Sequence, residues 1–72
     1  MPAVKPPSNL EDPVALAAWN SIERSCRMHK GLARNAKMAG DAPLNRYHHG
    51  YEEGLRKAMK IVVEKFGKEI QE

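Results

Sequence analysis

Apolar and small residues recur at alternating spacings of four and three through the first half of the chain. The series is Ala15, Trp19, Ile22, Cys26, His29, Ala33 and Ala36. This spacing gives a helix one face that is suited to close packing against another helix. Asp12 followed by Pro13 predicts the helix start, because aspartate can accept from the free amides and proline fits the first turn. We predict a helix over residues 13–39 that stops at Gly40.

A second apolar pattern covers a wider arc of a helix that we predict over residues 45–70. Its members are Tyr47, Tyr51, Leu55, Ala58, Met59, Val62, Val63, Phe66 and Ile70. Between the two patterns lies Gly40-Asp41-Ala42-Pro43, so we assign residues 40–44 to a turn, with Asp41 or Asn45 as the next cap. Two long helices joined by a short turn predict an all-α fold, an antiparallel two-helix hairpin.

The first eleven residues differ from the rest of the chain. Residues 1–11 contain Pro2, Pro6 and Pro7 and have little to bury, so we interpret them as a disordered or extended proline-rich arm. The hairpin then occupies residues 12–72. A chain of 72 residues makes one domain with a small core, and such domains often need a staple, a metal or an oligomer.

The apolar arc of the second helix is wider than one partner helix can cover. We therefore expect two hairpins to pair into a homodimeric four-helix bundle. The residues expected at the oligomer interface are Trp19, Ile22, Leu55, Met59, Val62, Val63, Phe66 and Ile70.

The expected turn also predicts which residues face each other within one hairpin. In an antiparallel hairpin with this turn, the numbers of facing residues sum to about 83. Ala33 then faces Gly50, His29 faces Gly54, and Trp19 lies in the core near Glu64. Gly50 and Gly54 weaken a helix, so they indicate either a close approach of the two backbones or a shallow groove.

Charge adds a feature that packing does not explain. Lys and Arg total twelve against nine Asp and Glu, for a net charge of +3. Five cations and no acid lie between residues 24 and 40, within an arc of about 140° on the predicted helix. We call this set the basic stripe: Arg24, Arg27, Lys30, Arg34 and Lys37. Like charges on one helix face repel, so the stripe indicates either a solvated surface or an anionic partner.

We predict a small non-enzymatic binding module that docks the basic stripe, with Arg46, Tyr47 and Tyr51, on the acidic surface of a partner protein. If that surface normally receives nucleic acid, the module would be a competitor or inhibitor. Its size and bare hairpin resemble the small inhibitors and adaptors that bacteriophages and mobile elements encode.

Two alternatives to a protein partner remain open. The first is an RNA- or DNA-binding hairpin that contacts phosphates without base specificity, since the basic stripe has no aromatic residue on which bases could stack. In architecture alone, the expected dimer resembles the RNA-binding plasmid copy-number hairpins of the Rop type. The second alternative is a structural assembly subunit in which the wide apolar arc of the second helix drives oligomerisation.

Catalytic and metal chemistry receive little support from the sequence. Cys26, His29, His48 and His49 could meet in a metal site only across a dimer, and His48 with Glu52 is the reverse of the familiar Glu-x-x-His order. No phosphate-binding glycine loop or pair of carboxylates suited to acid–base work is evident. We therefore expect no enzyme activity, no catalytic residue, no metal and no cofactor.

Cellular location follows from the cysteine count and the apolar runs. The single Cys26 cannot form an internal disulfide, and the N-terminal sequence lacks the apolar core of a secretory signal. No apolar run reaches the length of about 18 residues that a membrane span needs. We expect a soluble cytoplasmic protein that does not associate with membranes.

Overall fold

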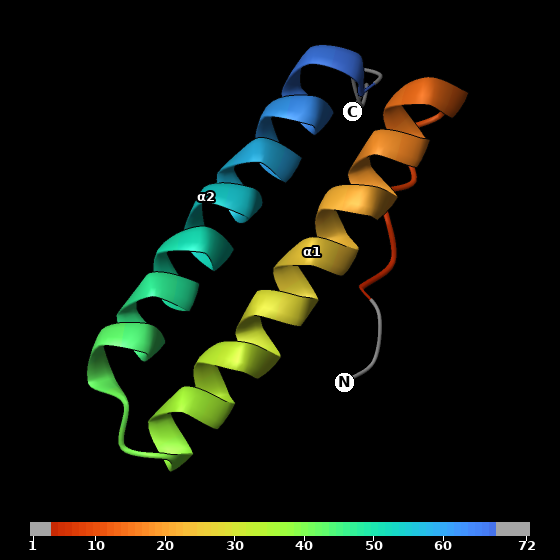
Figure 1. Cartoon of the computed structure of the whole chain (residues 1–72). Helices are drawn as coiled ribbons and strands as arrows, with labels where there is room; N and C mark the ends of the chain where they lie inside the picture. Colours follow the sequence, from red (N-terminus) through yellow and green to blue (C-terminus); the bar gives the residue numbers. More distant parts are fainter. Residues whose placement is uncertain (1–3, 68–72) are drawn as a thin grey trace.

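The computed structural model describes residues 4–67, which form two antiparallel helices packed along their length (Figure 1). Helix α1 spans Pro13–Met38 and helix α2 spans Ala42–Phe66. The described part of the chain contains no strand, so the prediction of an all-α hairpin is confirmed. The expected continuation of the second helix to Ile70 lies outside the described residues.

Aspartate side chains cap the start of both helices. Asp12 accepts a hydrogen bond from the Ala15 amide at 2.8 Å, and Asp41 accepts one from the Leu44 amide at 3.1 Å. Both caps precede a proline in the first turn, where its missing N–H costs nothing. Of the two caps considered for the second helix, Asp41 is used, and α2 therefore begins three residues earlier than residue 45.

Gly40 ends α1 in the left-handed conformation, with φ of 76°. Its amide donates to the Lys37 carbonyl at 3.1 Å, and the Asp41 amide donates to the Ala36 carbonyl at 2.8 Å. These two bonds satisfy carbonyls that the helix end would otherwise leave free. Glycine is favoured at this position because a side chain would be strained at a positive φ.

We expect alanine to have opposite effects at two of the glycines. Gly40→Ala should lower the free energy of unfolding by about 1–2 kcal/mol, because a Cβ is disfavoured in the left-handed region. Gly31→Ala, inside α1, should raise it by up to about 1 kcal/mol, since alanine is the better helix former and its Cβ would meet no atom within 4 Å. Urea unfolding followed by circular dichroism, at one protein concentration, measures both. A change of the same sign in both variants would contradict this account of the turn.

The register of the two helices differs from the expected one by more than a turn. Cys26 Sγ donates to the Glu52 carbonyl at 3.7 Å, whereas the expected register places Cys26 opposite Lys57. His29 contacts His48 rather than Gly54. The prediction was wrong because Asp41 starts α2 directly after Gly40, so the turn is shorter and each α1 residue meets an earlier α2 residue.

The core lies at the end of the hairpin away from the turn. Trp19, which is 3 % exposed, forms a buried cluster with Leu10 and Ala15. Half-buried side chains pack around this cluster: Leu16, Met59, Val62 and Val63. The core position expected for Trp19 is confirmed. The segment of residues 4–11, by contrast, contributes more than expected, because Leu10 is buried and this segment runs beside α1 (Figure 1).

Candidate functional site

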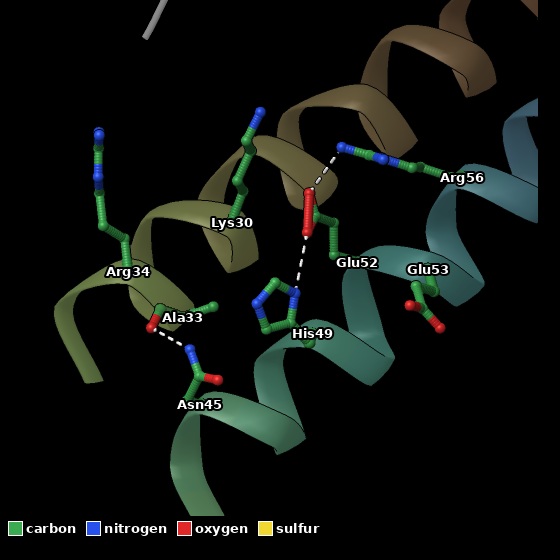
Figure 2. A pocket seen from close by; sticks show the side chains of 8 residues that line it. All are labelled: Lys30, Ala33, Arg34, Asn45, His49, Glu52, Glu53 and Arg56. Atoms are coloured by element: carbon green, nitrogen blue, oxygen red, sulfur yellow. Dashed lines mark hydrogen bonds and ion pairs between the residues drawn. The ribbon is translucent and has the colours of Figure 1, made fainter. Parts of the chain in front are cut away.

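One side of the seam between the helices forms a groove edged by cations, with a volume of about 560 Å³ (Figure 2). We call it the cationic groove. From α1 it is lined by Lys30, Ala33 and Arg34, and from α2 by Asn45, His49, Glu52, Glu53 and Arg56. Asn45 fixes its end nearest the turn, since its side-chain amide donates to the Ala33 carbonyl at 2.7 Å. The groove therefore joins part of the basic stripe to α2.

Glu52 is the buried anion of this groove. It is 4 % exposed, and its carboxylate accepts a hydrogen bond from Arg56 Nη2 at 2.9 Å. His49 Nδ1 lies 3.5 Å from the other carboxylate oxygen. Figure 2 shows Arg56 and His49 converging on Glu52, while Lys30 and Arg34 extend away from α1. A buried carboxylate needs such partners, because burial without them is costly.

A second buried carboxylate belongs to Glu23 of α1, which is 6 % exposed. Arg27 Nη2 lies 3.7 Å from it, and the Val4 amide of the arm donates to it at 3.3 Å. Glu23 and Glu52 both line an adjoining pocket of about 290 Å³, together with Cys26. Each carboxylate is paired with one guanidinium, so Glu23 holds Arg27 in place and Glu52 holds Arg56 in place.

The burial of these two carboxylates was not among the features predicted from the sequence. Glu23 follows Trp19 by four positions and precedes Cys26 by three, a spacing that places it on the packed face of α1. Glu52 has the same relation to His48 and Leu55 on α2. This spacing was the signal for burial in the sequence. A glutamate is buried only where a cation reaches it, and the spacing does not show that cation.

The basic stripe is only partly neutralised within the hairpin. Arg27 is half-buried and paired with Glu23. The other four members are exposed and form no ion pair with any of residues 4–67: Arg24, Lys30, Arg34 and Lys37. Four positive charges on α1 are therefore available to an external anion.

Tyr47 and Tyr51 lie on the other side of the seam from the cationic groove. They line a separate groove of about 480 Å³ with Gly50, Gly54 and Leu55. His29 stacks on Tyr51, with ring centroids 4.4 Å apart, while its neighbour Lys30 lines the cationic groove. Adjacent residues of a helix point about 100° apart, which places these two side chains on different sides of the seam.

The structure places Lys30 and Arg34 of the basic stripe and the two tyrosines, which were expected to form one surface, on different sides of the seam. The cationic groove and the tyrosine groove share no lining residue. Arg46, the third residue expected to help the stripe, is exposed and lines neither groove.

Tyr51 affects the ionisation of Tyr47. A hydrogen bond with Tyr51 raises the pKa of the Tyr47 hydroxyl, and the charge that an ionised Tyr51 would carry raises that pKa further. The rings meet edge to face with centroids 5.2 Å apart. Since tyrosine ordinarily ionises near pH 10, a raised pKa keeps Tyr47 uncharged at neutral pH.

Gly50 and Gly54 do not serve a close approach of α1 and α2. A Cβ added at either position would meet no atom within 4 Å. Of the two interpretations drawn from the sequence, the shallow groove is the one present, and both glycines line it with the tyrosines. Their helix-weakening effect thus has no compensation inside the hairpin.

Four of the eight residues expected at an oligomer interface pack together in the core of the hairpin. Trp19 is buried in the core, and Met59, Val62 and Val63 pack against it, because α1 meets α2 on this face. Ile22 and Leu55 are half-buried, and Phe66 is exposed. Ile70 lies outside the described residues. Trp19 in particular is not available to a second chain.

The candidate metal ligands are engaged in hydrogen bonds. The two Nδ1 atoms of His29 and His48 lie 2.9 Å apart, so one ring donates to the other, and Cys26 donates to the Glu52 carbonyl. Within residues 4–67, no group of three or more His, Cys, Asp and Glu side chains is placed to hold a metal ion. Neither described helix has a stretch long and apolar enough to cross a membrane.

Comparisons with protein-family models, with curated proteins and with solved structures gave no match. The functional argument therefore rests on the two grooves and on the charges that line them.

Proposed function

We propose that this chain is a non-enzymatic, cytoplasmic binding module that acts as a homodimer of hairpins. Each hairpin docks its cationic groove and the basic stripe on an acidic surface of a partner protein. Where that surface normally receives nucleic acid, the module competes for it and acts as an inhibitor.

The observation that carries this proposal is the arrangement of anchored and free cations. Glu23 and Glu52 hold the guanidiniums of Arg27 and Arg56 at the seam. Lys30 and Arg34 line the same groove as Arg56 and form no ion pair with any of residues 4–67. Guanidinium groups bind carboxylates through two parallel hydrogen bonds, and groups held in place beforehand lose less entropy on binding.

The acidic residues that line the cationic groove favour a protein partner over a nucleic acid. Glu53 is exposed on the lining of the cationic groove, and it would repel a continuous run of phosphates. A protein surface can offer carboxylates to Lys30 and Arg34 and a donor to Glu53. Phosphate binding without base specificity remains the alternative that the experiment distinguishes.

The decisive experiment is capture from host lysate, with and without nuclease, by wild type and by Lys30→Glu/Arg34→Glu. Both residues are exposed and unpaired within the described chain, so reversal should leave the fold intact. Arg27 is avoided, because a glutamate there would lie beside buried Glu23. The matched control is Lys57→Glu/Lys60→Glu, which makes the same change of charge on exposed residues of α2 outside the cationic groove.

We expect a nuclease-resistant partner whose affinity falls at least about tenfold in the groove variant and is unchanged in the control. Equal loss in both variants would mean that only net charge matters. Recovery of nucleic acid, with affinity that falls steeply with salt, would favour the phosphate-binding alternative.

A further inference from the structure

Helix α2 carries two adjacent packing faces, although the hairpin uses only one. The face that meets α1 includes His48, Glu52, Leu55, Met59 and Val62, at spacings of four and three. A second series, Tyr47, Tyr51, Gly54, Ala58 and Ile61, has the same spacing one position earlier and is followed by Lys65. Every helix of a four-helix bundle needs two such faces, one for each neighbouring helix.

The second series is mostly exposed in the hairpin. Tyr47, Tyr51 and Ile61 are 55 %, 48 % and 54 % exposed. Large apolar side chains at this spacing are typical of a helix face that packs against protein.

Helix α1 has a matching exposed face on the same side of the seam as the tyrosines. The spacing of four and three runs through Val14, Ala18, Ser21, Ser25, Met28 and Leu32 without a charged residue. Helical geometry places this series on the side of α1 that carries His29, which stacks on Tyr51. The two series together form what we call the uncharged face. The free cations of the basic stripe lie elsewhere on α1.

Gly54 lies in the middle of the uncharged face. Glycine inside a helix costs about 1 kcal/mol relative to alanine. Nothing within the hairpin requires this cost, because a Cβ at Gly54 would meet no atom within 4 Å. A second helix could approach α2 closely at the groove between Tyr51 and Leu55, because Gly54 has no side chain.

We propose that a second copy of this chain covers the uncharged face, so that two hairpins form a four-helix bundle about a two-fold axis. Apart from Lys65 at one end, this face offers no charge to an acidic or basic partner, whereas two identical uncharged faces complement each other. The cationic grooves then remain open on the outside of both hairpins. This inference locates the interface of the dimer proposed above and is independent of what the groove binds.

Sedimentation velocity over a wide concentration range tests the interface with substitutions at two glycines. Gly54→Arg places a charge in the uncharged face, and Gly31→Arg places the same charge on α1, one turn from Arg27 and from Arg34. Each glycine has open space for a Cβ in the hairpin, and arginine is the better helix former, so both variants should fold. Ile61→Arg, at an exposed position of the same face, is a second interface variant, and circular dichroism checks helicity.

We expect wild type and Gly31→Arg to sediment as dimers. Gly54→Arg and Ile61→Arg should retain helicity, with dissociation constants raised at least about 100-fold. A monomeric wild type, a dimer unchanged in both interface variants, or equal dissociation in the Gly31→Arg control would overturn the inference. Lys30→Glu/Arg34→Glu should stay dimeric, so a failure of the groove proposal is separately visible.

Discussion

Trp19→Ala should destabilise the hairpin by about 3–5 kcal/mol, which is the usual cost of removing a buried aromatic side chain. Trp19 is 3 % exposed and lies at the centre of the core cluster with Leu10 and Ala15. A chain of this length has a total stability of about 4–11 kcal/mol. The substitution therefore removes a large share of the stability, and a substantial fraction of the variant should be unfolded at 25 °C.

Thermal and urea unfolding followed by circular dichroism measure this loss, since the variant lacks its tryptophan fluorophore. Phe66→Ala is the matched control, because Phe66 is also aromatic but is 58 % exposed. We expect the control to lose less than about 1 kcal/mol. A similar loss in both variants would mean that the core does not centre on Trp19.

Arg56→Ala should be more damaging than Glu52→Leu, although the two residues form one ion pair. Removing Arg56 leaves the buried carboxylate of Glu52 with only His49 beside it, at a cost of about 1–3 kcal/mol. This is less than the ~3–5 kcal/mol of fully enclosed pairs, because the cationic groove admits water. Glu52→Leu leaves Arg56, whose side chain is 60 % exposed, free to turn to water, so we expect a change within about 1 kcal/mol.

A double-mutant cycle in urea tests this asymmetry. Glu52→Leu/Arg56→Ala should recover most of the stability lost in Arg56→Ala, since no buried charge is left unpaired. Additive losses in the double variant would show that the two side chains act independently and that Glu52 does not anchor Arg56.

Local signals in the sequence predicted the hairpin and both ends of its first helix. The Asp12-Pro13 start and the Gly40 stop each depend on a few neighbouring residues. Such features are readable from sequence because the atoms that satisfy a helix end belong to adjacent residues.

The register and the buried carboxylates depend on contacts between the helices. Choosing Asp41 over Asn45 as the cap moved every facing pair by more than a turn, so His29 met His48 instead of Gly54. Glu23 and Glu52 are tolerated at packed positions because Arg27 and Arg56 reach them. A periodic pattern shows which positions of a helix are apolar. It does not show which cation reaches a buried carboxylate.

The grouping of the binding residues needed the register as well. The sequence alone allows Tyr51 and the basic stripe to share one surface. The structure shows that His29 stacks on Tyr51. That contact assigns the tyrosines to one side of the seam and Lys30 to the other.

The tight turn at Gly40 and Asp41 also has a consequence for how fast the chain folds. Asn45 and the Ala33 carbonyl are separated by only 12 residues, so their contact closes a short loop at small entropic cost. Pairs farther from the turn, such as Cys26 and Glu52, can form after it in order of distance. A helical hairpin built from such local contacts should fold in microseconds to milliseconds, so a slower, concentration-dependent phase would report association of two chains.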